Sequence, residues 1–358
     1  MNKPEIIAEI GSGHSGDLTH ARELIAAAAE SGADCAKFQL IIADEIIHPR
    51  TGNVRLPTGA VPLYERFRAL ERPISFYAEC AAECEKRGLR FLCTAFGVDG
   101  LARVASLGVA RVKVASPELN HLPLLRAIAE RELHAVVSTG VSRLGDIERA
   151  VDLLGPARTT ILHCITAYPA PEHEYNLQII PRLKALFGVA IGVSDHSLDA
   201  RIVPGCALAC GAAAIEKHFT LNRHGIGLDD PIALGPDEFR TMTQFLETLC
   251  THPHEELEHL LAGEFGRQRV QAALGDGVKR LAPSERQNYG RSNRSLHALV
   301  ELSVGDPLNR ENCALLRSEH NLRPGIAPEH FDSVLGARVS AAVPPGEGIR
   351  WDDLLQRG

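Results

Sequence analysis

The stretch Gly192–Asp229 decides the fold: it reads GVSDHS at 192–197, AAIEKHFTL at 213–221 and RHGIGLD at 223–229. Ala190–Val193 and Ala213–Ile215 are short apolar runs, and each stops at a polar triplet that ends in histidine. Buried parallel strands have this pattern, because both faces are covered until the strand meets its loop. The sequence therefore predicts two neighbouring strands that each place a histidine at the same rim.

His196 and His218 are the first candidate site residues. They are 22 positions apart, about the length of one βα unit, and have the same phase relative to their strands. A single histidine at a strand end is more often simply hydrogen-bonded. Two neutral imidazoles on one rim suit Mn, Fe, Co or Zn, so the pair predicts a divalent-metal site.

Length, charge and composition restrict the class of protein. The chain has 358 residues, enough for a barrel of about 250 residues plus a small module. A net charge of −7 argues against nucleic acid as the main partner. No apolar run reaches the roughly 18 residues of a membrane span. Nine cysteines scattered through core-like segments favour small buried residues in a reducing cytoplasm.

Strand-like apolar runs alternate with helical patterns along the chain, giving eight βα units without an antiparallel signal. A parallel sheet of eight strands closes most simply into a TIM (β/α)8 barrel, so the predicted class is α/β. The polar stretch Ile41–Pro62 exceeds the usual loop length and is interpreted as a functional loop or a lid. The other predicted strands are Glu5–Ile10, Cys35–Leu40, Arg90–Cys93, Arg111–Ala115, Ala135–Val137 and Thr160–Leu162. The predicted helices are Leu18–Ser31, Ile74–Arg87, Val98–Leu107, Leu122–Glu130, Arg143–Leu154, Leu177–Leu186, Arg201–Cys210 and Pro236–Leu249.

Every predicted strand ends in polar or charged residues, and barrel chemistry sits at this carboxyl-terminal rim. Lys37 and Lys113 stand inside apolar strand ends, where an ammonium is costly unless an anion pairs with it. Serines and threonines at other exits, such as Ser138-Thr139-Gly140, complete a cradle for phosphate or carboxylate. The residues alone indicate a metal-assisted enzyme acting on a small anionic substrate.

A family resemblance agrees with this interpretation. The motifs IAEIGSGHSGD, AKFQ, FLCTAF, VKVAS, STG, LHCITAYP, GVSDHS and IEKHFTL closely resemble the sialic acid synthase family. That family comprises N-acetylneuraminate, legionaminate and pseudaminate synthases. After a linker at 280–291, the segment 292–358 resembles the family's antifreeze-like (SAF, β-clip) domain, on its turn motifs at 304–308 and 343–347 and on Asn321-Leu322-Arg323-Pro324-Gly325. The predicted catalytic barrel is then 1–279.

The resemblance implies a metal-dependent reaction in which phosphoenolpyruvate condenses with an N-acylated, N-acetylmannosamine-like aldose. The products are a nine-carbon 2-keto-3-deoxy acid and phosphate. It implies that His196 and His218 bind the metal, Mn2+ first and Mg2+ or Co2+ next, and that Glu9 orients the sugar or assists proton transfer. Phosphoenolpyruvate would be held by Lys37, Thr94, Lys113, Ser116, Ser138 and Ser194. The sugar side would be lined by Gln39, Phe96, Glu118, Tyr168 and Asp229. Arg323 would reach a neighbouring subunit of a domain-swapped homodimer.

Two positions depart from the family pattern. Gly13 stands where the first motif usually has Asn, and Thr166 stands where neuraminate synthases have Asn before the Tyr-Pro pair. The second motif touches the ligands, so the acceptor sugar stays open. A family member altered to use another sugar, a non-catalytic binding barrel, and an aldolase with a Schiff-base lysine are the alternatives.

Overall fold

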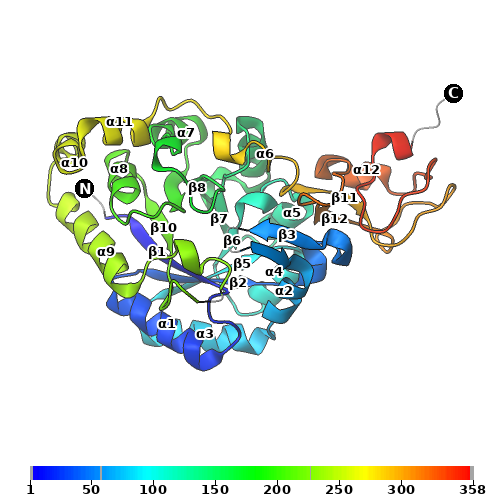
Figure 1. The fold of residues 1–358 in the computed structure, drawn as a ribbon, viewed down its shortest axis with the longest axis horizontal. Helices are drawn as coiled ribbons and strands as arrows, with labels where there is room; N and C mark the ends of the chain where they lie inside the picture. Colours follow the sequence, from blue (N-terminus) through cyan, green and yellow to red (C-terminus); the bar gives the residue numbers. More distant parts are fainter. Residues whose placement is uncertain (1–2, 57–58, 226, 355–358) are drawn as a thin grey trace.

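Eight parallel strands form a closed barrel in the computed structural model, which describes residues 3–56, 59–225 and 227–354. The order around the barrel is β1-β10-β9-β8-β7-β6-β5-β2 (Figure 1). The predicted TIM barrel is therefore confirmed. Its strands are β1 (Glu5–Gly11), β2 (Cys35–Leu40), β5 (Arg90–Ala95), β6 (Arg111–Val114), β7 (His134–Ser138), β8 (Thr159–Cys164), β9 (Ala190–Asp195) and β10 (Ala214–His218).

Helices cover the outside of the barrel. Helix α1 begins where Asp17 Oδ1 accepts hydrogen bonds from the backbone N–H groups of Thr19 and His20, which satisfies two free donors of the first turn. The helices between the barrel strands are α1 (Leu18–Glu30), α3 (Ile74–Lys86), α4 (Val98–Ala105), α5 (Leu122–Glu130), α6 (Leu144–Leu154), α7 (Ile179–Phe187) and α8 (Ile202–Ala209). Helix α9 (Pro236–Cys250) follows the last strand. Their apolar faces pack with the outward strand residues into one continuous core.

The stretch 41–62 is more ordered than the predicted loop. It holds two short 3-10 turns and an antiparallel hairpin of β3 (Asn53–Leu56) and β4 (Gly59–Pro62), followed by α2 (Leu63–Leu70). The interpretation of eight βα units without an antiparallel signal missed this hairpin. Val54 is buried in a small apolar cluster above the barrel, which holds the hairpin in place. Residues 57 and 58 lie outside the described residues.

Two helices beyond α9 were not predicted: α10 (Leu257–Phe265) and α11 (Arg267–Leu274). Each buries only two or three apolar side chains, so the periodic signal is weak. They explain why α8 is apolar on every side, since α10 and α11 cover the face of α8 that would otherwise meet water. Within the described residues, no helix is both long and apolar enough to cross a membrane.

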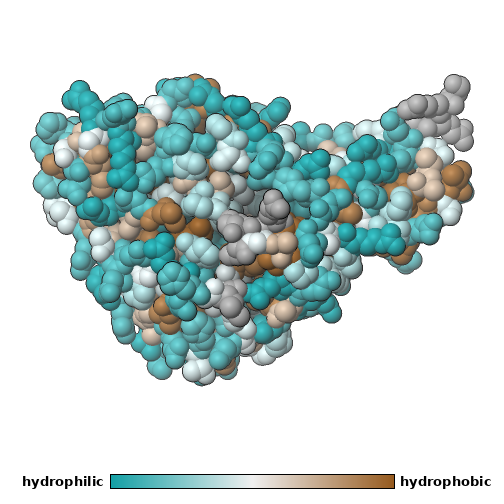
Figure 2. Space-filling view, viewed as in Figure 1, coloured by the Kyte–Doolittle hydropathy of each residue, from teal (hydrophilic) through white to brown (hydrophobic). Residues whose placement is uncertain are grey.

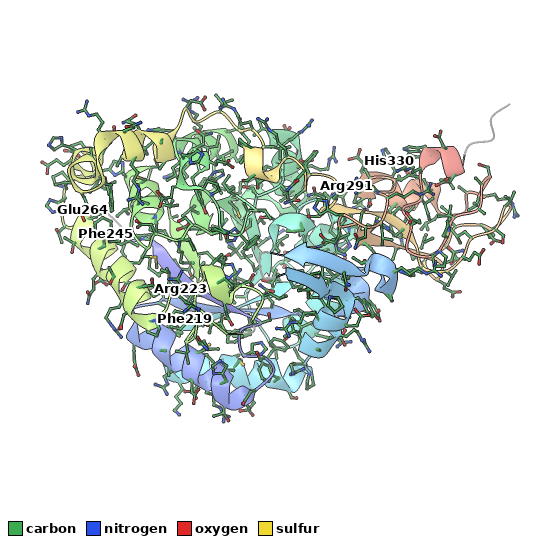
Figure 3. The ribbon with its side chains drawn as sticks, in the orientation of Figure 1. Phe219, Arg223, Phe245, Glu264, Arg291 and His330 are labelled. Atoms are coloured by element: carbon green, nitrogen blue, oxygen red, sulfur yellow. The ribbon has the colours of Figure 1, made fainter. Side chains whose placement is uncertain are left out.

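A second domain follows the barrel and contains the antiparallel pair β11 (Arg294–Ala298) and β12 (Cys313–Arg317) and the short α12 (Phe331–Val334). It has its own apolar core, and it lies beside β3 and α5 in Figure 1. A small domain after the barrel is therefore present, as predicted. Figure 3 labels Arg291 where the chain enters this domain and His330 within it. The face drawn in Figure 2 is mostly hydrophilic, with small apolar patches.

The cysteines fit the prediction of small buried residues. All nine are free, and seven of them are buried. The Cys80 and Cys84 pair lies on one face of α3 inside the core, where burial raises the pKa of the Cys80 thiol to about 12. A thiol that stays protonated is a poor metal ligand.

Candidate functional site

The carboxyl ends of the barrel strands surround a cavity of about 190 Å³. We call it the rim cavity. It forms here because all eight strands point the same way, so their last residues meet in one ring. Most predicted site residues line it, contributed by every strand of the barrel: Glu9, Lys37, Gln39, Thr94, Phe96, Lys113, Ser116, Ser138, Tyr168, Ser194, His196, His218 and Asp229.

The two histidines face each other across one side of the rim cavity. Their ring centroids are 5.3 Å apart, and Tyr168 stacks on His196 at 4.3 Å. His196 Nδ1 lies 2.8 Å from the carbonyl oxygen of Ile165, and a carbonyl can only accept, so this nitrogen carries a proton. Burial lowers the pKa of His196, but the neighbouring Cys164 outweighs burial and raises this pKa to about 9. The other nitrogen, Nε2, therefore also carries a proton at neutral pH, and a metal would bind there by displacing that proton.

The environment of His218 also suits a metal ligand. Burial, together with the neighbouring His196, holds the pKa of His218 well below its usual value, which keeps the imidazole neutral. Asp229 Oδ2 lies 3.7 Å from His218 Nδ1. No group of three or more His, Cys, Asp or Glu side chains surrounds a common point among the described residues. The donor set is therefore two imidazoles, and a metal held there would keep open positions.

A buried group of charges lies beside His218, because Glu9 on β1 is its register partner and Glu216 stands two residues before it on β10. Lys37 Nζ lies 2.9 Å from Glu216 Oε1 and 3.3 Å from Glu9 Oε2, and all three side chains are at most 5% exposed. The internal carboxylates thus provide the anions that a buried lysine requires. Glu216 was not predicted as a site residue, although it stands in the quoted EKH triplet.

Lys113 is neutralised less than Lys37 by the carboxylates of the protein. Its Nζ donates to Ser138 Oγ at 2.6 Å and to the carbonyl of Val114 at 3.0 Å. Burial lowers the pKa of Lys113 to about 8, despite the attraction of Glu216. Within the described residues Lys113 has no carboxylate at ion-pair distance, so an anion that enters the cavity gains most from this ammonium.

The pKa values of Glu9 and Glu216 are shifted in opposite directions. Burial raises the pKa of Glu9 to about 7, because Lys37 offsets only part of the desolvation and Glu216 adds repulsion. Burial also acts on Glu216, but Lys113 and Lys37 outweigh it and hold the pKa of Glu216 at about 2. Two carboxyl groups with separated pKa values in one cleft are typical of acid–base chemistry. Glu9 is the one that can exchange a proton near neutral pH.

Two predicted site residues lie elsewhere. Glu118 is fully buried outside the rim cavity, where its carboxylate binds Arg294 and Arg317 of the C-terminal domain. Arg323 pairs with Asp353 at 2.6 Å inside its own domain. Neither residue lines the cavity in this chain, and the predicted role of Arg323 in a neighbouring subunit stays a prediction.

Arg317 is the arginine that the C-terminal domain brings to the rim cavity. Its guanidinium lies over the ring of Phe96, 5.4 Å from the centroid, while it binds Glu118. The backbone N–H of Arg317 also donates to the carbonyl of Ile46 at 3.0 Å, which joins β12 to the 41–62 stretch. The two domains thus meet at the edge of the site. No spacing in the sequence indicated this, because Arg317 and Glu118 are 199 residues apart.

A second cavity of about 440 Å³, which we call the outer chamber, continues from the rim cavity. It shares Phe67, Tyr168, Leu228, Asp229 and Arg317 with the rim cavity. The other residues that line the outer chamber are mostly apolar and come from several loops; they include Val54, Leu63, Leu198 and Ile232. The C-terminal domain contributes Glu319 and His320. Together the two cavities have room for a compact anion inside and a larger molecule outside.

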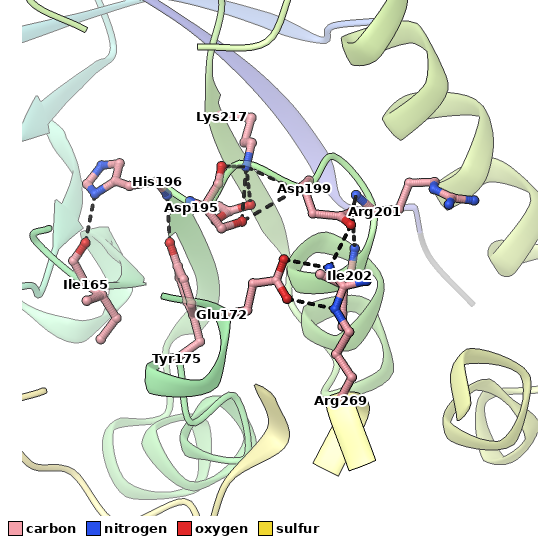
Figure 4. Close-up of polar contacts among 11 residues, drawn as sticks. Ile165, Glu172, Tyr175, Asp195, His196, Asp199, Arg201, Ile202, Lys217 and Arg269 are labelled. Carbon is pink, nitrogen blue, oxygen red and sulfur yellow. Dashed lines mark hydrogen bonds and ion pairs between the residues drawn. The ribbon is translucent and has the colours of Figure 1, made fainter. Parts of the chain in front are cut away.

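The loops behind His196 are held by buried polar contacts, which Figure 4 shows. The backbone N–H of His196 donates to Tyr175 Oη at 2.7 Å. Lys217 points away from the cavity, and its Nζ binds Asp195 Oδ2 at 2.6 Å and the carbonyl of Ser197 at 2.5 Å. These contacts fix the SDH triplet, so the direction of the His196 ring is set by groups outside the cavity.

The arrangement just described is found in known proteins. The model of the NeuB family matches residues 24–255, well over half of the chain. The chain belongs to the NeuB family. Residues 293–355 match the SAF domain, which confirms the predicted C-terminal SAF domain.

Two relatives resemble this NeuB-family chain over nearly its whole length. The N,N'-diacetyllegionaminic acid synthase of Campylobacter jejuni is 34% identical, over 98% of this chain and 100% of that protein. The spore coat polysaccharide biosynthesis protein SpsE of Bacillus subtilis is 32% identical, over 98% and 93%. The crystal structure of SpsE superposes with a TM-score of 0.82, covering 99% of this chain and 96% of that chain. The chain is an enzyme of this family.

Proposed function

We propose that the protein condenses phosphoenolpyruvate with an N-acylated aldose, releasing phosphate and a nine-carbon 2-keto-3-deoxy acid of the sialic type. The observation that carries the proposal is the division of the rim cavity. Thr94, Lys113 and Ser138 come from β5, β6 and β7, whereas His196 and His218 come from the ends of β9 and β10 on the other side of the barrel. Tyr168 and Asp229, which lie beside the histidines, also line the outer chamber. A small anion and a sugar aldehyde can therefore meet between them.

The anionic side fits phosphoenolpyruvate. Lys113 donates to Ser138, and the backbone N–H of Gly140 donates to Ser116 Oγ at 3.0 Å, so donors from two neighbouring loops converge. Thr94 Oγ1 is buried and has no hydrogen-bond partner in the described structure. An oxyanion placed among these groups would satisfy that hydroxyl and gain the uncompensated charge of Lys113.

The histidine side fits the aldehyde. A divalent metal held by His196 and His218, Mn2+ in our proposal, would supply a Lewis acid at the aldehyde oxygen. Glu9 is positioned by Gln39 Nε2, which donates to Glu9 Oε1 at 2.6 Å. With a pKa near 7, Glu9 can give a proton to the oxygen that becomes an alcohol.

The proposed reaction balances as follows. C3 of the enol phosphate bonds to the aldehyde carbon, and the aldehyde oxygen takes one proton. Water adds to C2, the C2–O bond to phosphate breaks, and C2 becomes the ketone. No oxidant or reductant is needed. Buried donors around the phosphate stabilise its departure.

The acceptor is the open part of the proposal. The outer chamber is lined by apolar side chains such as Phe67 and Leu228, which suit the methyl groups of N-acyl substituents. The 34% identical relative is named for an acid with two acetyl groups. We therefore propose that a di-N-acetylated aldose is used better than N-acetylmannosamine.

The test is phosphate release from phosphoenolpyruvate with Mn2+ against a panel of mono- and di-N-acetylated hexoses. In 18O-labelled water the label should enter the keto acid and not the phosphate, because the C–O bond breaks. Metal binding without turnover on any acceptor would instead favour a non-catalytic barrel.

One observation favours a second candidate, an aldolase. The lowered pKa of Lys113 makes its amine partly free at neutral pH, as a Schiff-base lysine requires. Borohydride reduction in the presence of pyruvate would then attach the ligand to Lys113. Protein of unchanged mass after this treatment would exclude the aldolase.

A further inference from the structure

A third cavity, of about 440 Å³, lies on the outer side of the barrel wall. It shares none of its lining residues with the rim cavity or the outer chamber. On β8, Leu162 belongs to the barrel interior and Cys164 lines the rim cavity, so His163 between them faces outward. The titratable residues of this outer-wall cavity are His163, His173, Glu174, Asp276, Lys279 and Arg280.

His163 presents an unused acceptor to this cavity. The residue is 2% exposed, and its Nε2 lies 2.6 Å from the carbonyl oxygen of Tyr175. Because a carbonyl only accepts, Nε2 carries the proton. Burial lowers the pKa of His163 to about 3, with Lys279 contributing, so the ring is neutral. Nδ1 is then a bare lone pair, and it has no partner in the described structure.

Lys279 presents a cation to the same cavity. Within the described residues, Lys279 Nζ donates one hydrogen bond, to the carbonyl of Thr139 at 3.1 Å, and no carboxylate lies at ion-pair distance. The buried carboxylate of Glu285 attracts Lys279 from beyond ion-pair distance, and its Oε1 accepts from the backbone N–H groups of Val141 and Thr166, both at 2.7 Å. The acids that line the cavity are also occupied, since Asp276 pairs with Arg280 at 2.7 Å and Glu174 Oε2 accepts from Ser284 Oγ at 2.6 Å. A half-buried ammonium whose one hydrogen bond goes to a carbonyl has no anion in direct contact.

We propose that the outer-wall cavity binds a small oxyanion that carries its own hydroxyl group, such as hydrogen phosphate. The anionic oxygens accept from Lys279, and the hydroxyl donates to Nδ1 of His163. The negative charge is required by the ammonium of Lys279, and the hydroxyl group is required by the lone pair of His163. That lone pair repels an oxyanion that has no proton to donate. The inference does not depend on the reaction proposed above.

This pairing predicts selectivity between two ions of the same shape. At neutral pH phosphate keeps a proton and sulfate does not. We expect phosphate to bind at least about tenfold more tightly than sulfate, the factor for one hydrogen bond to a charged group. Among carboxylates, glycolate carries a hydroxyl group and acetate does not, so glycolate should bind more tightly than acetate. Comparing the affinities of glycolate and phosphate then shows whether the cavity prefers a hydroxy acid or a hydrogen phosphate.

Calorimetry should be done on a Lys113→Met protein, in which phosphate binding at the rim cavity is weakened. Adding Lys279→Met should reduce phosphate affinity about tenfold or more. Adding Lys86→Met, which removes a lysine that is 74% exposed on α3, should leave it unchanged. Equal affinity for phosphate and sulfate, or no effect of Lys279→Met, would overturn the proposal.

Crystals of the unaltered protein provide a measurement that needs no variant. Arsenate keeps a proton as phosphate does, and selenate lacks one as sulfate does, and both scatter anomalously. After soaks at equal concentration, an arsenate peak between His163 and Lys279 with no comparable selenate peak is expected. Water alone at Nδ1 in both soaks would refute the site.

Discussion

Glu118 is the buried carboxylate that neutralises two arginines at the contact between the two domains, and replacing it with Gln tests how much this charge stabilises the contact. Glu118 and Arg294 are both fully buried, with Glu118 Oε2 2.5 Å from Arg294 Nε. Arg317 reaches the other carboxylate oxygen. Glutamine keeps the size of the side chain and removes its charge, so the change leaves two guanidinium groups in the interface with no anion.

The expected loss of stability follows from this geometry. Breaking a buried ion pair by removing one partner costs about 3–5 kcal/mol. Arg294 retains bonds to the carbonyls of Phe96, at 2.7 Å, and Leu315, at 3.1 Å, which reduces the cost. We therefore expect about 3 kcal/mol, a shift of about 1 M or more in the urea midpoint of the interface and C-terminal domain.

The single tryptophan makes the measurement specific. Trp351 lies in the C-terminal domain, so its fluorescence reports that domain, while far-UV circular dichroism reports mainly the barrel. The matched control is Glu132→Gln, which removes a carboxylate that is 80% exposed and paired with Arg158 at 3.4 Å. A surface pair of this kind contributes under about 1 kcal/mol. Equal midpoints for the two variants would refute the reasoning.

Acid provides a second measure of the same contact. Burial favours the protonated acid, but Arg294 and Arg317 outweigh it and hold the pKa of Glu118 far below its ordinary 4.5. A depressed pKa gives stability that is present above the unfolded value and is lost as pH falls below it. Between about pH 5 and pH 3 the natural protein should therefore lose more stability than Glu118→Gln. Parallel curves would contradict this.

Three further predictions concern the site. His196→Ala or His218→Ala should abolish Mn-dependent phosphate release without changing the circular dichroism spectrum, because rim residues contribute little to the core; full activity of the double variant after chelation would contradict the metal site. Lys113→Met should raise the KM for phosphoenolpyruvate far more than that for the sugar, because its ammonium lacks an internal carboxylate partner; equal changes would remove Lys113 from the anion side. Arg323→Ala protein mixed with His218→Ala protein should recover part of the activity if subunits exchange and Arg323 acts in trans; heterodimers without recovery would exclude that role.

The fold and most of the rim could be predicted from local sequence. Each barrel strand is an apolar run of a few residues that ends in a polar group. Because βα alternation makes the strands parallel, these polar groups all lie at the carboxyl-terminal rim of the barrel. His196 and His218 have the same phase in their strands, so their shared rim follows from parallel direction alone. The hairpin at 53–62 gave no comparable signal, because its burial comes from contacts with other loops.

The charges of the site required the closed barrel. Lys37 is on β2 and Glu216 on β10, with β1 between them, and only closure of the sheet brings their side chains within 2.9 Å. The sequence showed that Lys37 needs an anion, but it could not show that the protein supplies one. The same holds for the raised pKa of Glu9, which results first from burial in the closed barrel and then from repulsion by Glu216 on β10.

What the sequence by itself determined is the barrel, the SAF domain and the set of groups at the strand ends, because periodicity and strand direction are local properties. The tertiary structure decided which of those groups neutralise one another and where the second domain sits. Glu118 is occupied by Arg294 and Arg317 instead of facing a ligand, and Arg317 rather than Arg323 lines the cavity in this chain. These outcomes depend on contacts between residues nearly 200 positions apart, whose charges interact only once folding removes the water between them.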